Sequence, residues 1–294
     1  MEVRERENSY GTMWLWAGVA EELVAWKACC VREGSFDGDD VNLCTNVSNG
    51  FGMSWGQAGG NALWSVQFRF TGETAHSAGS PWRGRSALDA IMLMAQAWEF
   101  KREHLRPAAR SHYIIVEGGD QPNVVPQTAT IWFFLREVDY EHVVEMYDAA
   151  KLMAQGEAMM TGTQMDTIMT IGSAWSRRCS KPVAEVAQAN IELVGLPEWS
   201  DDDIAMANAL QREMGQEPRG LATSVPPLRG PINLEQYAGG GSDDIGDVSW
   251  NMPTVTMRYP ANMPGGPGQI RRRHTSELQS RRNLVCRLLL EKKK

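Results

Sequence analysis

The stretch "ALWSVQFRF", residues 62–70, decides the fold of the central part of the chain. Its apolar residues alternate with more polar ones, so the apolar side chains share one face of an extended strand. A helix is predicted next, at residues 86–105. Ser86 and Asp89 have the spacing of a helix cap, and apolar residues then recur at helical spacing. This region therefore opens with a strand followed by a helix.

Two more strands, a second helix and a last strand complete the pattern. The strands are predicted at residues 111–119 and 128–137, the helix at 140–160, and the last strand at 165–175. The order strand, helix, strand, strand, helix, strand is typical of a ferredoxin-like α+β domain, in which two helices cover one face of an antiparallel sheet. We therefore expect such a domain at residues 62–175.

The flanking segments, residues 1–61 and 176–268, each look too small and too mixed to fold alone. We interpret them as two pieces of one α/β domain, interrupted by the ferredoxin-like insertion. The second piece contains two helical patterns and the strand pattern "TVTMRYP" at residues 254–260. Residues 269–294 carry a net positive charge and lack a clear helical stripe, so we expect a basic, disordered tail there.

Composition limits the classes of protein that this chain can be. The 294 residues include 43% hydrophobic and 22% charged residues, which is ordinary for a globular protein. The chain has no run of about 18 apolar residues that would indicate a membrane span, and it shows no secretory signal. The five cysteines are scattered and form no C-x-x-C pair, which favours the cytoplasm. The net charge is −7, and residues 1–268 carry 20 basic and 34 acidic residues, so an acidic body argues against nucleic acid as the main partner.

Two adjacent carboxylates, Glu21 and Glu22, lie in the otherwise apolar run "AGVAEELVAW", after the short strand pattern "GTMWLWA" at residues 11–17. Ionised side chains are rarely buried unless they are paired or bound to a metal. The pair is therefore either solvated at the start of a helix or part of a site. In a site, one carboxylate would be a general base and the other a metal ligand.

Three further side chains are candidates for chemistry. His76 lies among small residues in "TGETAHSAGSPWRGRSALDA", where an imidazole could donate to a developing oxyanion. Asn123 lies between prolines, and Arg136 lies at the end of the strand that follows. Together they could bind a carboxylate. The structural alternatives are a histidine in a turn, an ordinary turn residue and a surface arginine.

The loop "YAGGGSDDIGDVSW", residues 237–250, could close around a ligand with its backbone N–H groups. It is not a phosphate-binding P-loop, because no Lys-Ser/Thr pair follows the glycines. It is not a dinucleotide fingerprint either, since no G-x-G-x-x-G stands between a strand and a helix.

Together these motifs resemble one family, the zinc aminoacylase and carboxypeptidase superfamily, in the branch of amidohydrolases similar to aminobenzoyl-glutamate utilisation protein B. The matching pieces are "GTMWLWAGVAEEL", "FTGETAHSAGSPWRGRSALDA", "SHYIIVEGGDQPNVVP", "FFLRE" and "GGGSDDIGDVSWNMPTVTMRYPANMPG". The resemblance implies a zinc-binding α/β domain with an inserted ferredoxin-like lid that forms a homodimer. The reaction that it implies is hydrolysis of an N-acyl amino acid or of a peptide-like amide bond.

Roles carry over residue by residue through this resemblance. Glu21 would be the general base that activates a metal-bound water, and Glu22 would be a ligand to one of two zinc ions. His76 would reach into the site of the partner subunit and steady the tetrahedral oxyanion. Asn123 and Arg136 would hold the carboxylate or backbone of the substrate. Gly241 and Ser242 would line the pocket.

The sequence also departs from the family pattern. The first histidine and the bridging aspartate of the metal site should precede the Glu pair, and they are absent. Asn46 stands where a further histidine is expected, and nothing around His274 matches the last one. We therefore expect a chain truncated at both ends, with Glu22 alone of the family ligands. The alternative to an enzyme is a dimerising remnant without catalysis.

Overall fold

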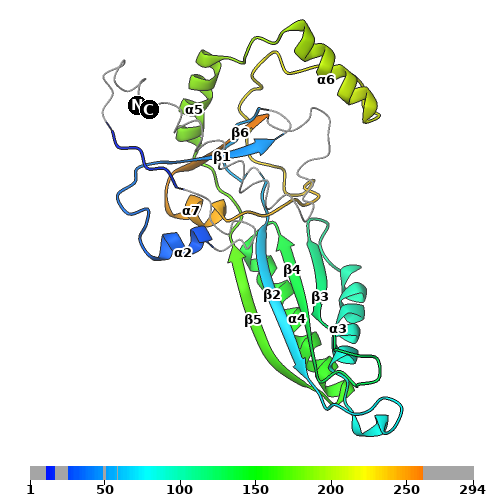
Figure 1. Ribbon diagram of the computed structural model, residues 1–294. Helices are drawn as coiled ribbons and strands as arrows, with labels where there is room; N and C mark the ends of the chain where they lie inside the picture. Colours follow the sequence, from blue (N-terminus) through cyan, green and yellow to red (C-terminus); the bar gives the residue numbers. More distant parts are fainter. Residues whose placement is uncertain (1–10, 17–25, 49–50, 58, 261–294) are drawn as a thin grey trace, which may run out of the picture. The chain divides into compact units, whose positions relative to one another are not determined.

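The computed structural model describes residues 11–16, 26–48, 51–57 and 59–260 (Figure 1). The chain divides into two compact units, each of which is assembled from segments distant in the sequence. The first unit consists of Met1–Asp40, Gln57–Arg178 and Pro231–Pro253, and the second of Val41–Gly56, Cys179–Gly230 and Thr254–Lys294. The expected tail and the Glu21–Glu22 pair lie outside the described residues.

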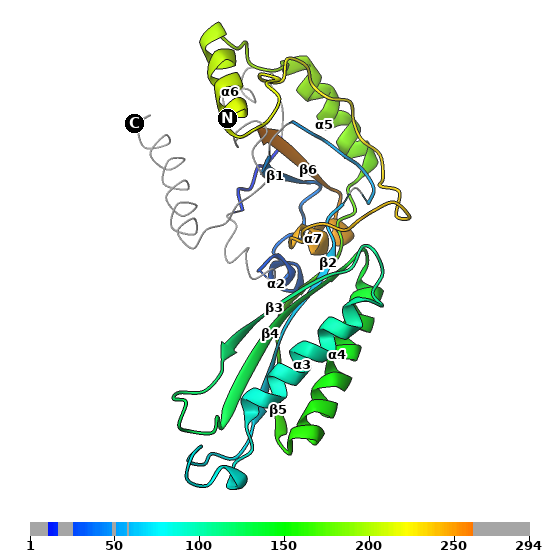
Figure 2. The ribbon, with the colours of Figure 1, turned by 90° about the vertical axis from the view of Figure 1, so that its right-hand side faces the viewer.

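The first unit is built around a four-stranded antiparallel sheet with the strand order β3-β4-β2-β5. Its strands are β2 (Ala62–Thr71), β3 (Arg110–Glu117), β4 (Thr128–Glu137) and β5 (Gln164–Ala174). Two helices, α3 (Ala87–Arg102) and α4 (Tyr140–Thr161), lie side by side on one face of this sheet (Figures 1 and 2). The predicted ferredoxin-like domain is thereby confirmed, and we call it the lid.

The two helices of the lid begin where the sequence provides caps. The Ser86 hydroxyl accepts a hydrogen bond from the Asp89 backbone N–H at 3.2 Å, and the Asp139 carboxylate accepts one from the His142 N–H at 2.9 Å. Helix α4 ends at Gly162, whose φ of 65° is the left-handed conformation that glycine adopts without strain. The short helix η2 (Pro81–Arg83) precedes α3.

The core of the lid fills the space between the sheet and the two helices. Phe133 is fully buried, and its ring contacts the rings of Phe68 and Trp98 at centroid distances of 6.1 and 5.5 Å. The Trp98 indole N–H donates to the Ser111 hydroxyl at 2.8 Å, so this buried polar group is satisfied. The alternation of the two central strands therefore has its expected consequence: one face of β2 and of β4 is apolar and packed under the helices.

Each connection of the lid lies at one of its two ends. We call the end with residues 72–86 and 118–127 the tip. The opposite end, where β2 begins and β4 ends, we call the base. Two short helices of the first unit, α2 (Trp26–Arg32) and α7 (Ile245–Asn251), pack against each other, and α7 also contacts β5. Residues 11–16 have no regular secondary structure, so the short strand expected there is not formed in the described part of the chain.

The second unit contains a parallel pair of strands, β1 (Asn42–Ser48) and β6 (Thr254–Pro260). Its helices are α5 (Lys181–Val194) and α6 (Asp201–Glu213). Strand β6 coincides with the predicted strand, and its Val255 packs with Met53 and Ala184 in a small apolar core. No helix within the described residues has the length and apolar character needed to cross a membrane. How the chain divides into domains stays a prediction.

We expect Phe133→Ala to lower the free energy of unfolding by about 3–5 kcal/mol, because it removes a fully buried ring. Phe100→Ala is the matched control: Phe100 is 68% exposed on α3, so its effect should stay within about 0.5 kcal/mol. Urea denaturation followed by circular dichroism measures both. Equal losses in the two variants would contradict this description of the core.

Candidate active site

His76 and Asn123 lie beside each other at the tip of the lid. His76 forms an isolated antiparallel bridge with Val124. The Ser77 N–H donates to the Asn123 carbonyl, and the Val125 N–H donates to the Ala75 carbonyl, each at 2.9 Å. Both predicted site residues are exposed. The structure therefore brings together two residues that are far apart in the sequence.

The backbone around His76 also selects the form of its ring. Nδ1 accepts hydrogen bonds from the backbone N–H groups of Ala78, at 3.2 Å, and Gly79, at 3.0 Å. A nitrogen that accepts cannot carry the proton, so these contacts assign the neutral tautomer with the proton on Nε2. His76 thus presents an N–H donor away from its own loop.

Arg136 lies at the base, in a site where its charge is not neutralised. Its Nη1 is 3.4 Å from Nδ1 of His112, and its guanidinium lies over the Phe134 ring at 5.0 Å. Its Nε is buried and has no hydrogen-bond partner among the described residues. Among the described residues no carboxylate forms an ion pair with it, and burial lowers the pKa of this guanidinium. An anion is the group that this position lacks.

The tip and the base of one lid are too far apart to serve the same small site. Strand β4 runs from Thr128, next to the tip, to Arg136 at the base. At ~3.4 Å per residue these positions are about 27 Å apart. Within one chain the structure therefore brings His76 together with Asn123, but it does not bring either of them to Arg136.

The glycine-rich loop lies against the base of the lid. The Arg110 guanidinium donates to the Ala238 carbonyl, and the Asn61 N–H donates to the Gly241 carbonyl at 2.9 Å. Gly239 has a φ of +87°, and a Cβ there would lie 2.5 Å from the Ala108 carbonyl oxygen. Only glycine fits this approach. The predicted pocket residue Gly241 is thereby held at the same end of the lid as Arg136.

The neighbouring residue Ser242 has a buried Oγ that finds no hydrogen-bond partner in the part of the chain that the structure describes. It is followed by an acidic group that sequence reasoning did not select. Asp243 pairs with Arg177 at 3.4 Å, and Asp244 is fully buried and paired with Lys27. Burial, with a smaller contribution from these two carboxylates, raises the pKa of Asp247 to about 7. The spacing of "SDDIGD" is the only signal in the sequence that could have indicated this group.

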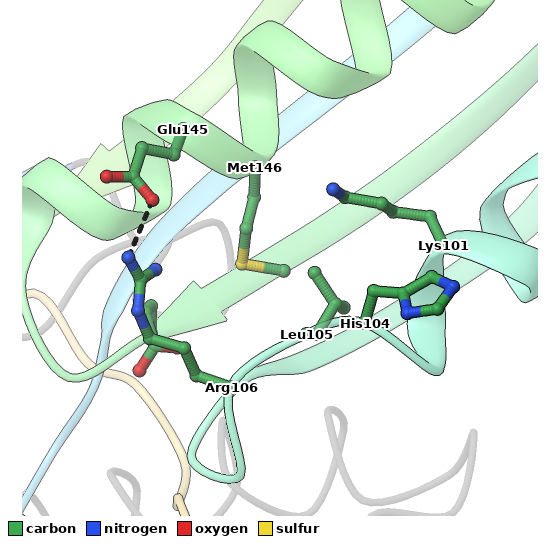
Figure 3. Close-up of a pocket in the computed structure, with 7 residues that line it drawn as sticks. Lys101, His104, Leu105, Arg106, Glu145 and Met146 are labelled. Carbon is green, nitrogen blue, oxygen red and sulfur yellow. Dashed lines mark hydrogen bonds and ion pairs between the residues drawn. The ribbon is translucent and has the colours of Figure 1, made fainter.

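A cavity of about 280 Å³ also lies at the base, between the end of α3 and the start of α4 (Figure 3). Lys101, His104 and Met146 line it, and the ion pair of Arg106 with Glu145, at 2.9 Å, lies beside it. It contains none of the side chains that the sequence singles out. We assign it no role in the reaction.

The metal site that the family resemblance implies cannot be built from the described residues. Glu21 and Glu22 lie outside them. Within the described part of the chain, no group of three or more His, Cys, Asp or Glu side chains is arranged to hold a metal ion. A catalytic zinc usually takes three protein ligands.

Comparison with known proteins shows that the chain is similar to amidohydrolases and peptidases. Residues 60–161 match the family described as peptidase dimerisation domain. The chain is 30% identical to a subunit of the p-aminobenzoyl-glutamate hydrolase of Escherichia coli, over 90% of this chain and 59% of that protein. It is 23% identical to Xaa-Arg dipeptidase of Mus musculus, over 80% of this chain and 47% of that protein. It thus spans only about half of the length of these relatives.

A solved structure shares the fold. The aminobenzoyl-glutamate utilization protein of Klebsiella pneumoniae matches with a TM-score of 0.56 and 18% identity, over 82% of this chain and 55% of that chain. The lid contains the matched peptidase dimerisation domain. The chain is similar to amidohydrolases and peptidases over most of its length.

We expect Gly239→Ala to displace the glycine-rich loop, because the added Cβ would meet the backbone oxygen of Ala108. The Asn61 N–H, which donates to Gly241, should then exchange faster with deuterium. Gly241→Ala is the control, because a Cβ there meets nothing within 4 Å. Unchanged exchange at Asn61 in Gly239→Ala would contradict the described contact.

We expect Asp247→Asn to stabilise the protein at neutral and alkaline pH. The folded state raises the Asp247 pKa from 3.8 to about 7, so this carboxyl costs stability as the pH rises through that window. The variant should gain up to about 4 kcal/mol above the window and nothing below about pH 4. Thermal or urea unfolding measured across the pH range tests this. A gain that does not depend on pH would refute the assignment.

Proposed function

We propose that the protein acts in the hydrolysis of the amide bond of an N-acyl amino acid or a peptide-like substrate, of the aminobenzoyl-glutamate type. The observation that carries this proposal is the uncompensated guanidinium of Arg136 at the base of the lid. A desolvated cation with unused donors suits the carboxylate that every N-acyl amino acid carries. The similarity to the p-aminobenzoyl-glutamate hydrolase of Escherichia coli supports the same class of substrate.

The proposed roles divide between the two ends of the lid. At the tip, the Nε2–H of His76 would donate to the oxyanion that develops when the amide carbonyl is attacked, and Asn123 would hold the substrate beside it. At the base, Arg136 would bind the substrate carboxylate. The loop at Gly241 and Ser242 would line the same pocket.

We further propose a homodimer in which the tip of one lid reaches the base region of the other copy. The separation of about 27 Å along β4 supports this, because one lid cannot supply both ends to one small substrate. The outer strand of the sheet is a suitable surface for association. On β3, Ile114, Ile115 and Val116 are 58%, 48% and 51% exposed, and an exposed apolar edge strand is a place where chains associate.

The general base and the metal ligand are proposed to be Glu21 and Glu22, with zinc as the metal. When bound, zinc lowers the pKa of its water from about 15.7 to about 7, which is on the order of 12 kcal/mol of activation. Glu21 alone, a weak base, cannot supply that. Further ligands would have to come from residues outside the described part or from another chain. The scattered cysteines support the cytoplasm as its setting.

The direct test is turnover of p-aminobenzoyl-glutamate by the purified protein, with p-aminobenzoate separated by chromatography and zinc counted by atomic emission. The proposal expects amide cleavage that requires bound zinc. A stable dimer with neither zinc nor turnover would contradict it and would support a dimerising protein without catalysis.

The sharing of sites between two copies gives a second prediction. His76→Ala and Arg136→Gln should each abolish turnover, whereas a mixture refolded together should regain it. In a mixed dimer one site combines an intact tip with an intact base, so random pairing should restore about a quarter of the original rate. A mixture of His76→Ala with Asn123→Ala is the control. In this mixture both substitutions lie at the tip, so no mixed dimer contains an intact site. Failure of the first mixture to regain turnover would rule out the shared site.

A further inference from the structure

His112 and Arg136 share the face of the lid sheet that the helices leave uncovered. In the pairing of β3 with β4, Arg110 stands opposite Arg136, and His112 stands opposite Phe134. Residues opposite each other in an antiparallel pair point to the same face. The Arg136 guanidinium lies over the Phe134 ring and reaches diagonally to Nδ1 of His112, at 3.4 Å. The two side chains thus lie next to each other, and the Phe134 ring lies beneath the guanidinium.

The arginines around this pair differ in the hydrogen-bond partners that their guanidinium groups have. Arg102 forms two hydrogen bonds, at 2.7 and 2.8 Å, with the Glu99 carboxylate. Arg110 donates to backbone carbonyls, including those of Pro107 and Ala109. Among the described residues Arg136 has only a ring nitrogen as its hydrogen-bonding partner, and its buried Nε has none. Among the described residues neither Arg110 nor Arg136 has a carboxylate partner, and Arg136 also lacks any oxygen acceptor, so its donors are the least used of the three arginines.

The imidazole of His112 is held neutral beside that charge. Partial desolvation and then the charges of Arg136, Arg102 and Arg110 lower its pKa below the ordinary 6.5. Because its Nδ1 faces the Nη1 donor, its proton lies on Nε2. A carboxylate in the place of His112 would cancel the charge of Arg136. The neutral ring instead orients the guanidinium and leaves its charge for a ligand.

We propose that His112 and Arg136 form a clamp for the carboxylate of an N-acyl amino acid, and that His112 takes up a proton from solvent when this anion binds. The clamp rests on the proposed function only for the identity of its ligand. The bound anion offsets the charge of Arg136, which removes part of the repulsion that keeps the imidazole neutral. The imidazolium and the guanidinium then hold the carboxylate from two sides.

Linkage fixes the sign of the pH dependence. A ligand that raises the pKa of a group binds more tightly where that group is protonated. The affinity of the clamp for a carboxylate therefore rises as the pH falls toward and through the ordinary imidazole pKa of about 6.5. A site that used Arg136 alone would show no such rise, because a guanidinium keeps its proton throughout this range.

Isothermal titration calorimetry with p-aminobenzoyl-glutamate tests the clamp without requiring turnover. Titrations at about pH 6 in two buffers with different ionisation enthalpies count the protons taken up. The full chain should take up a clear fraction of a proton per bound ligand. His112→Gln keeps an acceptor for Arg136 but cannot titrate; it should bind within about threefold of the original affinity with no uptake. Arg136→Gln should weaken binding at least about tenfold.

Arg69→Gln is the matched control. Arg69 lies on the same face of the sheet, toward the tip, and its two carboxylate contacts are both at 4.0 Å. Its loss should change neither affinity nor proton uptake. Absence of binding, uptake that persists in His112→Gln, or an equal effect of Arg69→Gln would each overturn the clamp. Binding with His112-dependent uptake but no amide cleavage would contradict the proposed hydrolysis alone. Cleavage without such uptake would overturn the clamp alone.

Discussion

The unbroken antiparallel pairing of β2 with β4 is the constraint on which the rest of the lid depends. Its register runs from Ala62 opposite Glu137 to Thr71 opposite Thr128, and it places Phe68 and Phe133 together under the helices. A paired and packed ladder of this length is a rigid spacer. It fixes the tip loops at one end and Arg136 at the other, and so determines which residues can meet within one chain. The proposed sharing of sites between two copies rests on that spacing.

Charge, rather than shape, distinguishes the base of the lid as a candidate site. Buried or partly buried ions in proteins are normally paired, because desolvation is costly. The base follows this rule at Lys27 with Asp244 and at Arg177 with Asp243. Arg136 departs from it within the described part of the chain. Perturbed and unsatisfied ionisable groups cluster where ligands bind, and the neutral acceptor His112 explains how this one persists without an anion.

Much of the lid could be predicted from the sequence, because its signals are local. The alternation in residues 62–70 and the caps at Ser86 and Asp139 depend on neighbours a few positions away. The strand expected at residues 11–17 shows the limit of such signals. An apolar extended segment becomes a strand only when another strand pairs with it, and sequence alone names no partner.

The candidate site was harder to predict, because it depends on register and on distant contacts. Local sequence context indicates His76, Asn123 and Arg136 as candidates, and the resemblance supplies their roles. Their separation into a tip and a base follows only from the pairing of whole strands. His112 belongs to no motif, and its lowered pKa depends on its partial burial and on the arginines around it. Asp247 likewise looks like a surface residue of a short helix until its burial is known.

The central claim, that one site needs the lids of two copies, is tested most directly by the mass of the protein in solution. Light scattering on the purified chain at micromolar concentration should give twice the chain mass of 32.7 kDa. A mass of 32.7 kDa across that concentration range, in a sample that still cleaves p-aminobenzoyl-glutamate, would contradict the account.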